Sequence, residues 1–284
     1  MQDSLTGITQ DRRLQLLLIA FCFGAFFEGA AGFGTPVAVT AAMLIGLGFS
    51  PLAASGLTLI ANTAPVAYGA LGTPIIALHG VTGLDLHALS AMVGRQLPFF
   101  SVVIPFWLVW AFAGLRGARE VWPAVLVAGV CFAVTLFLVS NFLGPWLVDV
   151  IGSVISMGAL VLVLLVWHPR RIWGFDGHAA DVAPRNRHHH SRGLVVRAWV
   201  PWAILSVLVF VWGIPAVKKY LDGIWVEAVS VPHLDMAVMR MPPVVAQAAP
   251  EAARYTFNML STTGTGILAA ALVSALVMGY RPRE

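Results

Sequence analysis

The sequence predicts an all-α, polytopic transmembrane helical bundle that contains a broken-helix, re-entrant hairpin. Of its 284 residues, 59% are hydrophobic and only 11% are charged, whereas a typical soluble domain carries about 25% charged residues. Long stretches such as Leu97–Ala113 and Ile151–Val166 contain no charge. Two further apolar stretches are interrupted by glycine, proline and hydroxyl residues, as broken membrane helices are.

This composition excludes several classes of protein. A water-soluble globule of this size could not bury so much apolar surface, so soluble enzymes, disulfide scaffolds and nucleic-acid modules are ruled out. The apolar stretches lack the alternation of β-barrel strands. No His-Glu-x-x-His, Gly-x-Ser-x-Gly or Walker sequence is present, so we expect neither an enzyme nor a bound cofactor or metal. Cys22 and Cys131 lie in apolar segments and do not indicate a disulfide framework.

Five uninterrupted segments are expected to cross the membrane. A bilayer core of about 30 Å needs roughly 20 predominantly apolar residues per helix. The segments that approach this length are Pro98–Ala113, Pro123–Val139, Ile151–Val166, Ala198–Ile214 and Thr263–Gly279. With the interrupted stretches, we expect about six to eight passes in a single transmembrane domain over residues 1–284.

Two interrupted stretches complete the predicted bundle. Leu14–Phe49 is too long for one span and is broken at Glu28–Pro36, so we expect two passes or a re-entrant hairpin with a non-helical tip. Leu52–Leu78 is a broken span, interrupted at Asn62-Thr63-Ala64-Pro65. Non-helical backbone at membrane depth is tolerated only where it is buried in protein or lines a watery cavity.

The charges of the loops orient the chain. The loop His168–Arg197 holds six arginines against two aspartates, while Pro215–Thr262 has four basic and four acidic residues. Because loops rich in Lys and Arg stay in the cytoplasm, residues 168–197 are expected to form a basic cytoplasmic loop and residues 215–262 an outer connection. The same rule places Arg12 and Arg13 inside if Leu14–Phe49 enters and returns. The run His188–His190 is interpreted as solvated linker rather than a metal site.

The two breaks are the expected binding site. Each ends in Gly-Thr-Pro, at Gly34–Pro36 and Gly72–Pro74, where the proline suits the start of a helix and the threonine suits its cap. A half-helix that begins at membrane depth directs N–H groups and a positive dipole end at an anion such as a carboxylate. The candidate binding residues are Gly34, Thr35, Asn62, Thr63, Gly72 and Thr73. The alternative is that the glycines only allow close helix packing.

Two charged residues are added to this candidate site. Glu28 is the acidic residue deep within an apolar run, where a charge is costly and usually functional, so it is the candidate proton carrier. The alternative is a structural glutamate that caps the broken hairpin. Arg95, just before a span, could pair with a carboxylate in a bidentate fork. Its alternative role is an interfacial anchor that extends to lipid headgroups, and Arg240 has the same two interpretations.

Several longer motifs resemble one family. They are Ile8–Gln15, Phe21–Gly34, Asn62–Ala70, Met92–Pro98 and Arg240–Val245, which read ITQDRRLQ, FCFGAFFEGAAGFG, NTAPVAYGA, MVGRQLP and RMPPVV. In this order they resemble the bacterial L-lactate permease family over nearly the whole chain, least closely in the Arg/His loop.

The resemblance implies proton symport of L-lactate, and often of glycolate and D-lactate, across the bacterial cytoplasmic membrane. It also implies, more distantly, a transporter fold built from two inverted repeats. The expected partners are the monocarboxylate, protons and the lipid bilayer, with no nucleic acid. Family members continue beyond both ends of the matched region, so the chain is expected to be an internal fragment or a truncated member. The alternative function is a non-transporting membrane scaffold or regulatory fragment.

Overall fold

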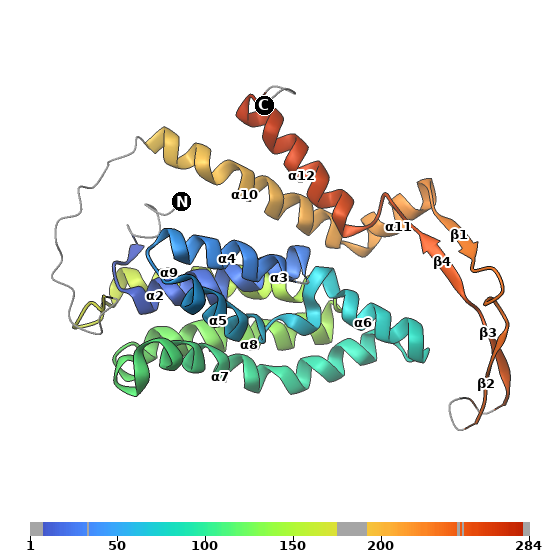
Figure 1. The fold of residues 1–284 in the computed structure, drawn as a ribbon, viewed down its shortest axis with the longest axis horizontal. Coiled ribbons are helices and arrows are strands. Elements are labelled where there is room, and N and C mark those ends of the chain that lie inside the picture. The colour runs from blue at the N-terminus through green and yellow to red at the C-terminus, as the bar shows by residue number, and fades with distance from the viewer. Residues whose placement is uncertain (1–7, 33, 175–191, 243–244, 246, 281–284) are drawn as a thin grey trace.

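The computed structural model describes residues 8–32, 34–174, 192–242, 245 and 247–280, and these residues form mostly helices (Figure 1). In chain order the helices are α2 (Arg12–Leu16), the π-helical η1 (Leu17–Phe23), α3 (Gly24–Ala31), α4 (Thr35–Gly46), α5 (Pro51–Asn62), the 3-10 turn η2 (Val66–Tyr68), α6 (Gly69–Thr82), α7 (Leu86–Glu120), α8 (Trp122–Phe142), α9 (Val148–Val166), α10 (Arg192–Gly213), α11 (Pro215–Ile224) and α12 (Thr263–Met278). The strands are β1 (Glu227–Ser230), β2 (Val238–Arg240), β3 (Ala249–Glu251) and β4 (Arg254–Phe257).

The rod formed by α2, η1 and α3 is the centre of the bundle. It runs without interruption over Arg12–Ala31, and every side chain from Arg13 to Ala30 is buried. The rod contacts α4, α5, α6, α7, α8 and α9 along its length. On a further side, the rings of Phe23 and Phe27 pack edge-on against Trp202 of α10. Because other elements pack around the rod, its apolar side chains lie on all of its faces rather than along one stripe.

The stretch Leu14–Phe49 contains two helical segments joined by a short turn. The rod ends at Ala31, Gly32 and Gly34 adopt positive φ angles of 62° and 90°, and α4 returns in contact with α3 and η1. The expected threonine cap is wrong at this point: the N-cap of α4 is Gly34, and no side chain caps the helix. Glycine holds that position because its φ lies in the left-handed region, which threonine disfavours.

The stretch Leu52–Leu78 holds more than one helical segment. The segment Val66–Thr82, formed by η2 and α6, is bent by 68° from α5 across residues 63–65. The left-handed turn then falls inside α6, at Ala70, Leu71 and Gly72, with φ angles of 47°, 56° and 78°. The hydroxyl of Thr73 donates to the carbonyl of Ala70 at 2.6 Å, so this threonine closes the turn through a carbonyl instead of accepting from a backbone N–H as a cap would.

Helices α7, α8 and α9 pack side by side and enclose the rod from the other flank. Helix α7 is longer than the predicted span Pro98–Ala113, because it begins three turns earlier, where Asp85 accepts from the N–H of Ala88 at 2.7 Å. Within the described residues, four helices are long and apolar enough to cross a membrane, and six if each bent helix pair is one span. Helices α4 and α12 are apolar but shorter.

The connection 215–262 departs from an all-helical bundle. Helix α11 turns by 77° from the preceding helix, and β1 pairs with β4 and β2 with β3 as two short antiparallel ribbons. Figure 1 shows these strands projecting from the bundle as an arm. Arg240 lies in β2, and its guanidinium forms an ion pair with Glu251 in β3. This ion pair joins the two strands of the ribbon.

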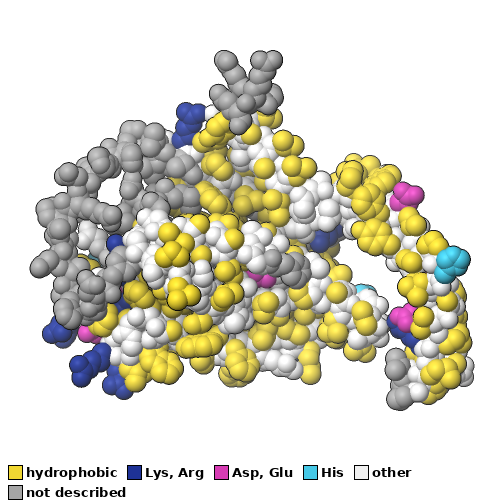
Figure 2. All heavy atoms as spheres, in the orientation of Figure 1, with side chains coloured by type: hydrophobic (Ala, Val, Ile, Leu, Met, Phe, Trp, Pro, Cys, Tyr) yellow, Lys and Arg dark blue, Asp and Glu magenta, His cyan; other side chains and the backbone are white. Residues whose placement is uncertain are grey.

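The basic segments gather at one end of the bundle, where Figure 2 shows a group of Lys and Arg side chains close to the end of α7. Arg13 is fully buried there and pairs with Asp11 at 2.7 Å and Glu120 at 2.9 Å. Its guanidinium also donates to the carbonyls of Gly117 and Arg171. The N-terminus of the rod, the end of α7 and the start of the basic loop therefore lie at one end of the bundle. Residues 175–191, including His188–His190, lie outside the described residues.

Replacing Arg13 by alanine should lower the free energy of unfolding by about 3–5 kcal/mol, because it leaves the buried carboxylate of Asp11 without its cation. Thermal unfolding of the purified chain in detergent measures the change. Arg116→Ala, at an exposed position of the same helix end, is the matched control and should stay within about 0.5 kcal/mol. Equal losses in the two variants would show that the network does not hold this end of the bundle.

Candidate functional site

The structure brings the two predicted breaks into contact. A Cβ placed on Gly32 would lie 2.8 Å from the Cβ of Ala70 and 2.9 Å from its backbone nitrogen. The tip of the first hairpin therefore rests directly on the left-handed turn of α6. Such a close approach requires glycine, and so does the backbone of Gly32, with φ at 62° and ψ at −176°.

Glu28 lies at this junction. It belongs to the last turn of α3, and its side chain is only 1% exposed. The carboxyl group packs against Gly69 so closely that a Cβ on that glycine would overlap Oε1 and lie 3.1 Å from Cδ. Glycine at position 69 thus makes room for the carboxyl group at the start of the broken helix.

A second buried acidic residue, Asp149, packs against α3 at Gly29, the residue after Glu28. It belongs to the first turn of α9 and is also 1% exposed. A Cβ on Gly29, the residue after Glu28, would lie 2.8 Å from the Cβ of Asp149 and 2.9 Å from the nitrogen of Val150. Sequence reasoning missed Asp149 because the predicted span began at Ile151, which left the aspartate in a loop. The helix begins at Val148, and its acidic first turn is the signal that could have found the residue.

The other predicted binding residues surround the junction in different environments. Gly72 is buried against Pro145, and a Cβ added to this glycine would lie 2.6 Å from the proline carbonyl oxygen. Asn62 is half-buried, and its Oδ1 atom has no hydrogen-bond partner among the described residues. Gly34, Thr35, Thr63 and Thr73 are exposed. The hydroxyl of Thr63 donates to the carbonyl of Ile60 at 2.7 Å.

Arg95 lies on the outer face of α7 and not at the junction. Its side chain is exposed, and Nε donates to Oδ1 of Asn141 in α8 at 3.0 Å. The preceding residue, Gly94, is the one that faces the break, since a Cβ there would overlap Ser140 and lie 3.1 Å from the hydroxyl of Tyr68. That hydroxyl donates to the carbonyl of Ser90 at 2.7 Å and ties η2 to α7.

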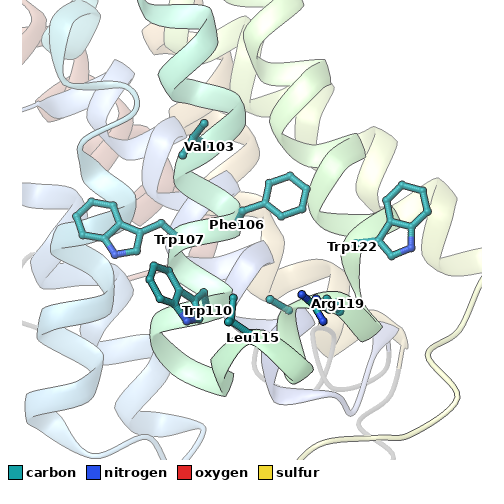
Figure 3. Close-up of a pocket in the computed structure, with 8 residues that line it drawn as sticks. Val103, Phe106, Trp107, Trp110, Leu115, Arg119 and Trp122 are labelled. Atoms are coloured by element: carbon teal, nitrogen blue, oxygen red, sulfur yellow. The ribbon is translucent and has the colours of Figure 1, made fainter.

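An apolar hollow of about 450 Å³ lies elsewhere, between α7 and α8 (Figure 3). Figure 3 shows the rings of Phe106, Trp107, Trp110 and Trp122 around it, with Arg119 near Leu115. This hollow is at the basic end, where Glu120 pairs with Arg13. Fifteen residues separate Arg13 from Glu28 along the rod, roughly 20 Å at 1.5 Å per residue. The hollow is therefore separate from the junction of the breaks.

Broken helices that meet inside a bundle of apolar helices are a feature of secondary transporters. The chain belongs to the L-lactate permease family, whose sequence profile matches residues 1–284. The family resemblance of the sequence motifs is thereby confirmed. Members of this family are permeases, which are generally not enzymes.

Curated relatives extend this comparison. The L-lactate permease of Salmonella typhimurium is 49% identical over 99% of the chain and 52% of the relative, and that of Bacillus subtilis is 46% identical over 98% and 53%. The glycolate permease GlcA of Escherichia coli is 46% identical over 98% and 52%. The chain thus spans about half the length of the curated relatives it matches. No solved structure matches it significantly.

A series of glycine-to-alanine variants should separate the constraints at the junction. Gly32→Ala combines a steric overlap with a left-handed backbone, whereas Gly34→Ala has only the left-handed backbone, because a Cβ at position 34 would meet nothing within 4 Å. We expect Gly34→Ala to lose about 1–2 kcal/mol of folding free energy and Gly32→Ala clearly more.

Gly56→Ala is the control, because Gly56 lies inside α5 with open space around it. This variant should gain about 0.5–1 kcal/mol from helix propensity. Thermal unfolding in detergent measures all three variants. A Gly32→Ala variant as stable as the parent would contradict the contact between the two breaks.

Proposed function

We propose that the chain forms the substrate-binding region of a proton symporter for L-lactate and related small 2-hydroxy monocarboxylates, including glycolate and D-lactate. Membership of the L-lactate permease family supports lactate as the substrate, and the relatives named L-lactate permease and glycolate permease support this substrate range. The observation that carries the mechanism is the contact of the two broken segments at Glu28.

The substrate carboxylate is proposed to bind at the start of α4 and at the left-handed turn of α6. The first turn of α4 lacks a side-chain cap, so its dipole end is available to an anion. The exposed residues Gly34, Thr35, Thr63 and Thr73 and the buried Gly72 surround this region. The buried Oδ1 of Asn62, without a partner among the described residues, is suited to accept a hydrogen bond from the 2-hydroxyl group of the substrate.

Two charged groups complete the proposal. Glu28 is the proton carrier, because a carboxyl group enclosed at membrane depth is far less costly when protonated than when charged. Arg95 supplies a counter-charge on the outer part of α7, where its exposed guanidinium attracts the incoming carboxylate before the carboxylate reaches the buried junction.

The setting is proposed to be the bacterial cytoplasmic membrane. Because the chain covers about half of its relatives, transport is assigned to a protein of the relatives' length that contains this sequence. The remaining length is the proposed structural partner of the region described above. The competing function is a membrane scaffold that does not transport.

Uptake of labelled L-lactate into proteoliposomes tests the proposal. Vesicles with this chain and vesicles with a version of the relatives' length are compared with and without an inward proton gradient. Gradient-driven accumulation by either protein is the expected result. No uptake by either protein would contradict symport and support the scaffold function.

Glu28→Gln should abolish the response of uptake to the proton gradient, because the amide can neither bind nor release the coupled proton. Uptake is measured at a series of external pH values in whichever protein transports. Glu227→Gln, at an exposed position of β1, is the matched control and should keep the parental response. A parental pH profile in Glu28→Gln would remove this residue from the proton-coupling role.

A further inference from the structure

We propose that Asp149 is the second carboxyl group of the proton-coupling site, so that Glu28 and Asp149 together bind one exchangeable proton. This inference rests on the proposed symport function and adds to it a residue from a different helix. Three structural observations support it: the close approach of α9 to α3, the environment of the Asp149 carboxyl group, and the position of the pair beside the α6 break.

The first observation is the close approach of the two helices. Gly29 permits it, since a Cβ at that position would lie 2.8 Å from the Cβ of Asp149 and 2.9 Å from the backbone nitrogen of Val150. Glu28 is the residue directly before Gly29. The turn of α9 that carries Asp149 therefore packs against the turn of α3 that carries Glu28, and the charge of Glu28 acts on the carboxyl group of Asp149.

The second observation is that nothing in the described structure neutralises Asp149. Its side chain is 1% exposed, and neither carboxylate oxygen has a hydrogen-bond partner among the described residues. Its neighbours Leu147 and Val150 pack in an apolar cluster with Leu71 and Phe27. A buried carboxylate without a cation or a hydrogen-bond donor is strongly disfavoured. Asp149 is therefore suited to hold a proton rather than to stabilise the fold through an ion pair.

The elements packed around Asp149 offer few other titratable groups. Helix α3 contributes Glu28, η2 contributes Tyr68, and the described part of α8 contributes only Cys131. On η1, Cys22 lies further along α9, where its sulfur contacts the hydroxyl of Ser156. On α6, His79 is at the exposed far end of the helix beside Leu84. The partner of Asp149 in proton exchange is therefore Glu28.

Two carboxyl groups that interact in a medium of low dielectric constant do not ionise together, because the second negative charge is repelled by the first. The unloaded pair then carries one proton and a net charge of −1. A proton from the outside binds the remaining carboxylate and makes the pair neutral, and release of that proton to the inside restores the charge. One proton moves per cycle, which balances the single negative charge of one monocarboxylate.

The third observation links this charge to the substrate. Glu28 packs against Gly69, and Leu147 and Val150 beside Asp149 pack with Leu71. The carboxyl group of Glu28 thus adjoins the start of α6 directly, and the turn of α9 that carries Asp149 packs in the same cluster as Leu71. A negative pair at this turn repels the carboxylate of the substrate, and protonation removes the repulsion. Proton binding therefore precedes lactate binding.

The test compares Asp149→Asn, Asp149→Glu and Glu28→Gln in the transporting protein. We expect Asp149→Asn to lose gradient-driven accumulation of L-lactate, as Glu28→Gln does. Exchange of external labelled lactate for internal unlabelled lactate needs no net proton movement, so both variants should keep it. Asp149→Glu should regain gradient-driven accumulation with a shifted pH profile. Asp85→Asn is the matched control, because Asp85 is an exposed helix cap and asparagine caps equally well.

An infrared pH titration of this purified chain provides a readout independent of transport. The parent should show a titrating C=O band of protonated carboxyl groups that both Asp149→Asn and Glu28→Gln diminish. If Asp149→Asn loses exchange as well as accumulation, the variant either is misfolded or lacks a proton-binding group, and two results separate these cases. Regained accumulation in Asp149→Glu together with a diminished C=O band in Asp149→Asn supports the proton-binding role. The absence of both results indicates misfolding.

The outcomes separate the two proposals. Proton-driven uptake in Asp149→Asn at the parental pH profile, with Glu28→Gln inactive, would overturn the role of Asp149 and leave the symport function standing. Uptake driven by a sodium gradient instead of a proton gradient would overturn the proton as ligand of the pair. No uptake by the parent would contradict the symport function, and the infrared titration would still decide whether the pair holds a proton.

Discussion

The structure depends on one buried helical rod, Arg12–Ala31. Because protein surrounds the rod on every side, each polar side chain within it must find its partner inside the bundle. Arg13 meets this requirement at the basic end through Asp11, Glu120 and two carbonyl oxygens. Glu28 is placed near the opposite end, beside the glycines of both breaks. Burial of the rod thus has two effects. At the basic end the ion pairs of Arg13 hold the rod in place, and near the opposite end the acidic group of Glu28 lies next to the proposed substrate region.

Much of this arrangement follows from the sequence, because membrane-spanning helices and their interruptions are recorded in local composition. Uncharged stretches predicted the helices α7 to α10 and α12, and clusters of glycine, proline and hydroxyl residues predicted interruptions in the two remaining stretches. The ribbons of residues 227–257 were not predicted, since strands of three or four residues show too little alternation to be recognised. The extension of α7 to Leu86 was missed for a related reason: a helix continues beyond its apolar part where a cap such as Asp85 begins it.

A residue of the candidate site could be predicted where its chemical type alone identifies it. It could not be predicted where its role depends on the direction in which its side chain points. Glu28 could be selected because a charge inside an apolar run is unusual. Arg95 and Gly94 are neighbours in one motif, yet the glycine faces the break and the arginine faces outward. Rotation about a helix axis decides this difference, and it depends on how α7 packs against α8. Asp149 was not selected because the predicted span began at Ile151, whereas α9 begins at Val148 and carries the aspartate in its first turn.

The turn inside α6 has an energetic consequence. Ala70 and Leu71 both hold left-handed backbone angles, which cost roughly 1–2 kcal/mol for each residue that is not glycine. Packing of Gly32 against Ala70 and of Pro145 against Gly72 keeps the turn in place. A conformation that relaxed both residues would regain about 2–4 kcal/mol, equivalent to a population ratio of roughly 30 to 1,000. The conformational strain of this turn is therefore similar in size to the free energies with which ligands shift conformational equilibria.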